Sequence, residues 1–117
     1  MTLEQTFPRE LRLLTAKQYS YVFAGACRFA SQSFTLLVRR NDRTHPRLGL
    51  AIAKKSVKRA VDRNRIKRLL RESFRQKQHQ LPPIDIVAMC RPVVVQLTNT
   101  QILQQLEKQW YCIRKRY

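Results

Sequence analysis

The sequence predicts a single domain that combines helices with β-strands, and three observations support this fold class. At 117 residues the chain is long enough for one hydrophobic core and too short for two. Hydrophobic residues make up 44% of it and ten residues are aromatic, which argues against disorder despite a net charge of +17. Apolar residues recur at helical spacing in some segments and alternate as in strands in others.

The chain is expected to begin with an extended segment and a short helix. Residues 1–14 contain Pro8 and little periodicity, so they are predicted to lie extended against the body of the domain. The apolar side chains that can pack there are Phe7, Leu11, Leu13 and Leu14. Residues 15–18 have the sequence of a capping box and Gly25 is a typical helix end, which predicts a helix over residues 16–24.

Three apolar residues of this helix, Tyr19, Val22 and Phe23, share one face. Val22 is interpreted as a core residue. For Tyr19 and Phe23 two interpretations have equal weight on the residues alone. The first is core packing, and the second is stacking on bases of single-stranded nucleic acid, which contributes about 1–3 kcal/mol per base.

Two segments with strand composition follow, at residues 33–40 and 47–53. The polar turn at 41–46 lies between them, so the two are predicted to form a β-hairpin. A further short strand near residues 28–30 is compatible with the sequence. The second segment alternates bulky residues with Gly49 and alanines, and this bare side would let a helix or a ligand backbone come close.

The last third of the chain predicts a strand and a helix. Residues 84–90 follow the break at Pro82-Pro83 and are mostly apolar, which is typical of a central strand. A second capping box at 98–101 starts a helix, and its basic tail at 114–116 is interpreted as mainly solvated. The apolar stripe of this helix consists of Ile102, Leu103, Leu106, Trp110 and Ile113.

The most charged part of the chain is the segment 54–77. Eleven of its residues are Lys or Arg, against Asp62 and Glu72, so it holds a net charge of +9 out of the +17 of the whole protein. From Asp62, the expected N-cap, the segment predicts a helix. Its apolar face consists of Ile66, Leu69, Leu70, Ser73 and Phe74.

The opposite face of this helix carries a ridge of polar and cationic side chains. The ridge consists of Asn64, Lys67, Arg68, Arg71 and Arg75, with Arg65 just beyond it and Arg63 toward the apolar side. Glu72 can pair with Arg68 or Arg75, but each such pair stabilises a helix by only about 0.2–0.5 kcal/mol. Because the remaining charges repel one another, the ridge favours binding of nucleic acid over a merely solvated surface.

Composition disfavours several other classes of protein. A pI near 11.1 indicates an acidic partner, either nucleic acid or an anionic membrane. No apolar run approaches the roughly 18 residues of a membrane span and no signal pattern is present, which predicts a cytosolic protein without membrane association. Cys27, Cys90 and Cys112 are far apart and odd in number, so they are interpreted as small buried residues rather than disulfide or zinc partners.

No catalytic or metal-binding site is predicted within the protein itself. Its seven carboxylates are scattered along the sequence, whereas a metal-dependent nuclease needs clustered acids. His45 and His79 lie in polar surroundings without a neighbouring carboxylate and are interpreted as exposed. The two glycines are too far apart for a phosphate-binding loop.

The run KRAVDRNRIKRLLRE at residues 58–72 strongly resembles the central motif of the bacterial ribonuclease P protein component, in which R-N-R is followed by K-R and a further R. FPRELRLL, RLGLAIAKK and RESFRQKQHQLP also look like the gammaproteobacterial branch of that family, so the resemblance covers nearly the whole chain. It implies a small α+β domain with a four-stranded sheet in the order α-β-β-β-α-β-α. It also implies an unusual left-handed crossover that carries the basic helix.

The resemblance further implies a function. In the family, an RNA subunit uses magnesium ions to cleave the 5′ leader from precursor tRNA, and the protein is a non-catalytic part of this endoribonuclease. We therefore expect one protein monomer per catalytic RNA. The positions expected to contact RNA are Lys54, Lys55, Lys58, Arg59, Arg63, Asn64, Arg65, Lys67, Arg68, Arg71 and Arg75.

A cleft for the leader is implied between the first helix and the sheet. Tyr19 and Phe23 match its aromatic residues, which favours the stacking interpretation for both. Leu37 stands where some members have tyrosine, so a leader contact at that position is weakened. Lys58 and Arg59 replace small or neutral residues of other members and would add phosphate contacts.

Two other classes of function remain as alternatives. A structural RNA-binding protein, similar to a ribosomal protein, would use the same ridge without an aromatic cleft. A DNA-binding regulator would read the major groove with residues 62–77 and would usually need a dimer surface, for which the sequence offers no candidate.

Overall fold

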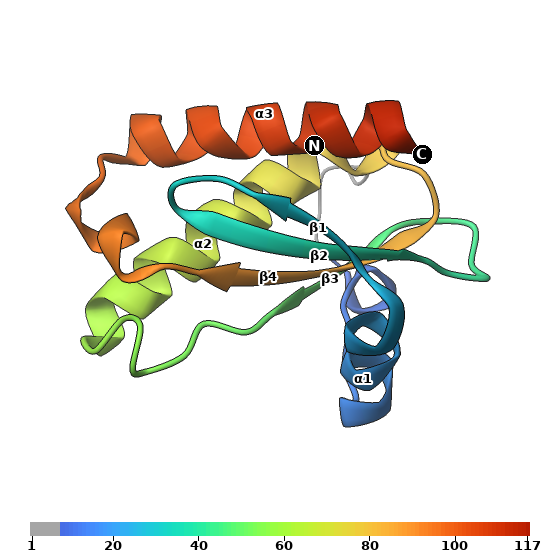
Figure 1. Cartoon of the computed structure of the whole chain (residues 1–117), viewed down its shortest axis with the longest axis horizontal. Helices are drawn as coiled ribbons and strands as arrows, with labels where there is room; N and C mark the ends of the chain where they lie inside the picture. The colour runs from blue at the N-terminus through green and yellow to red at the C-terminus, as the bar shows by residue number, and fades with distance from the viewer. Residues whose placement is uncertain (1–7) are drawn as a thin grey trace.

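In the computed structural model, which describes residues 8–117, the chain forms a four-stranded sheet packed with three helices (Figure 1). This confirms the predicted α+β fold class. The strands are β1 (Cys27–Ala30), β2 (Phe34–Arg40), β3 (Arg47–Leu50) and β4 (Ile84–Cys90). The helices are α1 (Ala16–Gly25), α2 (Ala60–Lys77) and α3 (Asn99–Arg116), and short 3-10 turns lie at Arg9–Leu11, Gln78–Gln80 and Pro92–Gln96.

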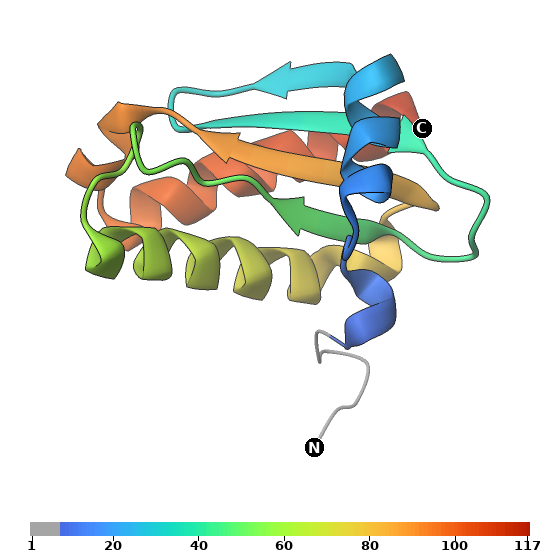
Figure 2. The same cartoon turned by 90° about the horizontal axis from the view of Figure 1, so that it is seen from below.

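The helices lie on both faces of the sheet. Figure 2 shows α1 crossing the strands on one face, with α3 behind the sheet and α2 along the side of β3. The main core lies between the sheet and the α2/α3 layer, and the strand residues Phe34, Leu36 and Val38 all point into it. A smaller apolar cluster under α1 contains Val22 and Val87. The basic helix therefore packs by its apolar face and leaves its ridge outward.

The predicted hairpin between residues 33–40 and 47–53 is wrong. The strand order is β1-β2-β4-β3, so β4 lies between β2 and β3. It pairs antiparallel with β2 and parallel with β3, and β2 forms its hairpin with β1. The first five residues of β4 are buried, which suits one of the two inner positions of the sheet. The handedness of the β3–α2–β4 connection stays a prediction.

The ends of the helices confirm some local predictions and correct others. Both capping boxes are present, at Thr15 and Thr98. α2 begins earlier than expected, with Arg59 at the N-cap, so the prediction of Asp62 as the N-cap is wrong. Asp62 lies instead in the first turn, where a carboxylate is favoured by the helix dipole. Its Oδ2 is 4.0 Å from Arg59 Nε.

The N-terminal segment is only partly extended. Arg9–Leu11 forms a 3-10 turn, because the Leu11 N–H donates to the carbonyl of Pro8 at 3.0 Å, so the expectation of a wholly extended segment is wrong. The chain then pairs with the edge of β3, where the Leu13 N–H donates to Leu48 O at 3.0 Å. Leu11 and Leu13 are buried, whereas Leu14 is 46% exposed. The packing of Phe7 falls outside the described residues.

A buried ion pair that the sequence did not reveal joins two strands. Arg47 Nε and Nη2 donate to the two carboxylate oxygens of Asp85 at 2.8 and 2.7 Å. Asn41 donates to the same carboxylate at 2.8 Å. The hydrogen bonds to Asp85 raise the pKa of Arg47 against the opposing effect of burial. The pair fixes the ends of β3 and β4 beside α1.

The last helix packs as predicted, and the cysteines differ from the prediction. Trp110 is buried, its indole N–H donates to Ser73 Oγ at 2.7 Å, and its ring meets Phe74 edge to face. All three cysteines are free thiols, but Cys112 is exposed, and Cys27 and Cys90 are only half-buried. The interpretation of Cys112 as a buried residue is wrong because it lies off the apolar stripe of α3, where it lines an open pocket with Lys108 and Gln109.

Candidate nucleic-acid interface

The ridge of α2 faces solvent, as its helical spacing predicted. Asn64, Arg68 and Arg71 are exposed, and Lys67 and Arg75 are half-buried. The apolar face predicted for this helix is buried along its whole length. Arg68 lies 3.9 Å from Glu72, with both side chains largely exposed, so this pair contributes at most about 1 kcal/mol. The ridge keeps a strong excess of positive charge.

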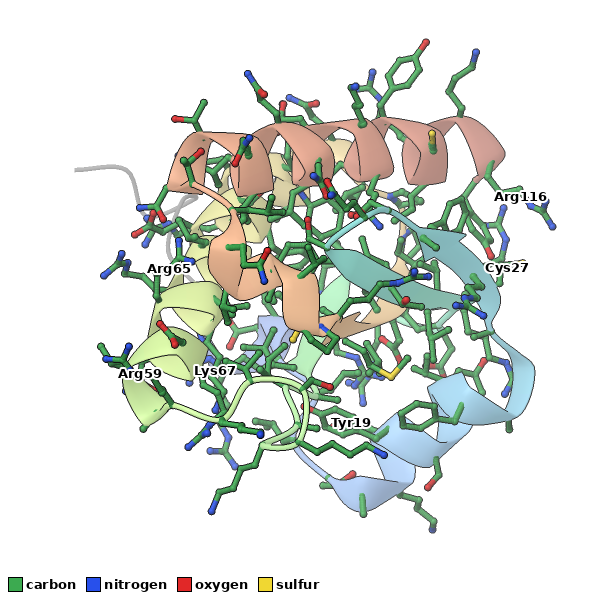
Figure 3. The ribbon with its side chains drawn as sticks, turned by 60° about the vertical axis from the view of Figure 1, so that its left-hand side comes forward. Tyr19, Cys27, Arg59, Arg65, Lys67 and Arg116 are labelled. Atoms are coloured by element: carbon green, nitrogen blue, oxygen red, sulfur yellow. The ribbon has the colours of Figure 1, made fainter. Side chains whose placement is uncertain are left out.

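The segment between β3 and α2 extends the basic surface. Lys54, Lys55, Lys58 and Arg59 are all exposed in this bend. The bend is held by Val57, which is buried in the main core and donates its N–H to Ala53 O at 3.0 Å. The four predicted cations of this segment therefore flank Val57, whose position is fixed by its burial. Figure 3 shows Arg59 and Lys67 on the same side of the molecule.

Two arginines of the central motif are held by protein groups. Arg63 Nη1 donates to the carbonyls of Val57 and Lys58 at 2.9 and 2.8 Å, so it ties the bend to the first turn of α2. Arg65 Nη1 donates to Asn99 Oδ1 at 2.5 Å, at the start of α3. The position of each guanidinium is thus set by the fold before any RNA is bound. Of the three motif residues, Asn64 is exposed, whereas Arg63 and Arg65 are half-buried.

A groove of about 430 Å³ joins the ridge to the first helix. Its lining residues are Arg12, Leu13, Tyr19, Leu48, Leu50, Lys67 and Arg71. It therefore brings one predicted cleft aromatic beside two predicted ridge cations. In Figure 3, Tyr19 and Lys67 both lie on the side away from α3. Arg12 is not among the residues predicted from the sequence, where its only signal is its place in the FPRELRLL run.

Tyr19 is fixed at the wall of this groove by the backbone of β3. Its hydroxyl oxygen accepts a hydrogen bond from the Leu50 N–H at 3.1 Å. A Cβ atom at Gly49 would lie only 2.7 Å from the ring of Tyr19, so glycine is required for this close approach. The bare side of β3 that the sequence indicated is therefore occupied by an aromatic ring of α1.

The other two predicted cleft residues are placed differently. Phe23 is 51% exposed, one helical turn after Tyr19, and does not line the groove. Leu37 is half-buried under α1, where it packs against the cluster of Leu13, Val22 and Val87. Leader contact at Phe23 and Leu37 stays a prediction.

Neither a cluster of metal ligands nor a helix that could span a membrane is present among the described residues. Within residues 8–117, no three side chains of His, Cys, Asp or Glu lie together in a way that could hold a metal ion. None of the helices in this part of the chain is long and apolar enough to cross a membrane.

Comparisons with known proteins agree with this geometry. The sequence model of one family, described as Ribonuclease P, matches residues 7–114. A ribonuclease P protein component from Photorhabdus laumondii is 56% identical over 104 residues, which are 89% of this chain and 87% of the relative. Another from Thioalkalivibrio sulfidiphilus is 52% identical over 110 residues, covering 94% of this chain and 92% of the relative.

Solved structures show the same fold. An RNase P protein from Staphylococcus aureus superposes with a TM-score of 0.81 at 27% identity, covering 87% of this chain and 94% of that chain. The RNase P protein from Thermotoga maritima gives a TM-score of 0.78 at 25% identity, with 87% and 96% covered. The sequence match, the fold and the placement of the R-N-R motif on an outward-facing basic helix lead to one conclusion: the chain belongs to the ribonuclease P family of protein components.

Proposed function

We propose that this chain is the subunit that lets the catalytic RNA of ribonuclease P bind and cleave precursor tRNA at the 5′ end of the mature sequence. The α2 ridge and the bend at residues 54–59 contact the catalytic RNA. The groove at Tyr19 receives the single-stranded 5′ leader. The complex acts in the cytosol, with one protein monomer per RNA.

The observation that carries this proposal is the groove itself. Tyr19 of α1 lines it together with Lys67 and Arg71 of α2, so a nucleotide strand in it would find an aromatic surface and phosphate partners close together. A purely structural RNA-binding protein has no need for such a combination. Tyr19 is held by Leu50 and Gly49, so little entropy is lost when a base stacks on it.

The charge of the protein explains why it would help an RNA enzyme. Catalytic RNA and precursor tRNA are both polyanions, and a subunit of net charge +17 relieves their repulsion. Binding releases counterions from the RNA, which makes the affinity strongly dependent on salt. Mature tRNA lacks the leader, so the groove contributes only to binding of the precursor.

The cleavage step belongs to the RNA in this proposal. Magnesium ions bound by RNA would supply the charge stabilisation and the activated water for hydrolysis. The described residues of the protein include no carboxylate cluster suited to hold such an ion. The protein's own side chains bind and orient the substrate.

Cleavage of a precursor tRNA at low magnesium tests the proposal. The cognate catalytic RNA is assayed with and without the protein, and the protein is also assayed alone. We expect cleavage at the mature 5′ end only when both components are present. If the protein leaves the rate unchanged over a range of salt and magnesium, the proposal fails and a structural RNA-binding role becomes the better account.

A further inference from the structure

A second group of cations lies at the other end of the sheet, outside the ridge and the groove. It consists of Arg39 and Arg40 at the end of β2 and Arg116 at the end of α3, together with Tyr21 and Tyr117, and we call it the arginine–tyrosine patch. Figure 3 shows Arg116 and Cys27 on the side opposite Arg59, Arg65 and Lys67.

Each arginine of the patch is held in place by the protein. The Arg39 guanidinium lies 3.9 Å from the centre of the Tyr21 ring, and its Nη1 donates to Tyr21 O at 2.6 Å. Arg40 lies 5.0 Å from the centre of the Tyr117 ring, and the Tyr21 hydroxyl donates to Arg40 O at 2.8 Å. Arg116 Nη2 donates to Cys27 Sγ at 3.4 Å.

The close packing around Arg39 extends to the end of α1. A Cβ atom at Gly25 would lie 2.9 Å from the Arg39 guanidinium carbon, so this glycine makes room for the cation rather than for a left-handed turn. This set of cations is therefore separate from the ridge of α2. It is positioned by the end of α1, by Tyr21 and Tyr117, and by the end of β2.

The charge of the patch is not compensated within the described part of the chain. The ion pairs found there involve Asp42, Asp62, Glu72, Asp85 and Glu107, and none of them includes an arginine of the patch. Side chains of a merely solvated surface would extend into water, whereas the guanidinium groups of Arg39 and Arg40 stack on aromatic rings. Fixed guanidinium groups are suited to bidentate contacts with phosphate.

We infer that the arginine–tyrosine patch is a second docking surface for RNA, and that it binds the phosphate backbone of a further segment of the catalytic RNA. This inference rests on the proposed function. Tyr21 is the one patch residue among the largely exposed apolar and aromatic side chains, and its hydroxyl and ring are engaged by Arg40 O and by Arg39, so the patch offers little apolar surface to a membrane. Phosphates of a polynucleotide remain as the best match.

The position of the patch favours the catalytic RNA over the leader. Tyr19 and Tyr21 are two residues apart and so lie on nearly opposite sides of α1. A leader bound in the groove at Tyr19 would have to cross this helix to reach Arg39 and Arg40. A large folded RNA can contact both ends of a molecule that is only 36 Å across.

The test compares two double variants with the same loss of charge. In the first, Arg40→Gln and Arg116→Gln remove two exposed cations of the patch. In the second, Lys108→Gln and Lys115→Gln remove two exposed cations of α3 that lie outside both surfaces, Lys115 stacking on Tyr111 rather than on a patch tyrosine. All four side chains are exposed, so both variants should melt at the temperature of the unaltered protein. Binding to the catalytic RNA is then measured over a range of salt concentrations.

Loss of two phosphate contacts should make the slope of log K against log salt shallower by about 1.4–1.8, which corresponds to roughly 25- to 60-fold weaker binding at 0.1 M salt. The lysine variant should keep the slope of the unaltered protein. If the two variants behave alike, the patch is only a solvated surface and the inference is overturned.

A second experiment measures the affinity of the assembled holoenzyme for precursor tRNAs with leaders of increasing length, with the unaltered protein and with the arginine variant. If the arginine variant binds catalytic RNA normally but loses affinity only for long leaders, the occupant is the leader and the inference is again overturned. If the unaltered protein itself fails to bind the catalytic RNA, the proposed function fails instead, so the two failures are distinct.

Discussion

Replacing Asp85 by asparagine should remove a large part of the stability of the fold. The carboxylate is 1% exposed and receives two hydrogen bonds from Arg47, whose side chain is 10% exposed. An arginine cannot lose its proton, so Asp85→Asn leaves a buried charge without its counter-ion. Breaking a buried pair in this way costs about 3–5 kcal/mol, out of a typical total of roughly 5–15 kcal/mol. The melting temperature should fall by roughly 10–20 °C.

Thermal unfolding followed by circular dichroism measures this effect, and Asp42→Asn is a matched control. Asp42 has the same chemistry, but its side chain is 98% exposed and lies 3.9 Å from Arg43, so its loss should shift the melting temperature little. The double replacement Arg47→Met with Asp85→Leu should recover much of the lost stability, because no unpaired charge remains. If Asp85→Asn is no more destabilising than Asp42→Asn, the buried pair does not hold the two strands as argued.

Three further predictions concern the groove and the thiols. Tyr19→Ala should weaken binding of a leader-bearing precursor by about 5- to 150-fold, because stacking of about 1–3 kcal/mol per base is lost, and should leave mature tRNA unaffected. Tyr19→Phe keeps the ring and should retain most of the affinity. Equilibrium binding of both RNAs to the holoenzyme measures the effect, and an equal loss for both RNAs would refute a leader site. Gly49→Ala should push the Tyr19 ring away from β3 and lower precursor affinity, which the same assay detects, and unchanged affinity would show that the ring position is unimportant. Burial raises the pKa of the Cys90 thiol, so at pH 8 it holds less reactive thiolate than an ordinary cysteine. An alkylating reagent followed by mass spectrometry should therefore label the exposed Cys112 well before Cys90, and similar rates would contradict this.

Local features of this fold could be predicted because their causes are local. The capping boxes at Thr15 and Thr98 depend on residues three positions apart, and the buried face of α2 depends on a spacing of three and four. The start of α2 was misplaced because Asp62 has the chemistry of an N-cap, while Arg59, the actual N-cap, makes no side-chain capping bond.

Pairings between distant residues could not be predicted in this way. Asp85 and Arg47 are 38 residues apart, and the alternation of each strand is equally compatible with several neighbours. Predicting the groove would also have required knowledge of how α1 crosses the sheet. Nothing near Tyr19 in the sequence indicates that Lys67 lies beside it. The family resemblance supplied the leader cleft as an expectation, and the structure shows a groove beside α1 that is lined by one of the expected residues, Tyr19.

The central position of β4 has a consequence for synthesis of the protein. A nascent chain that has emerged as far as residue 83 contains the β1–β2 hairpin, β3 and the basic α2, but no strand that joins them into one sheet. Contacts of such long sequence separation form late in folding. The wall of β3 against which Tyr19 packs is therefore completed only after residues 84–90 leave the ribosome. Until then the chain carries the positive charge of α2 without the groove beside Tyr19.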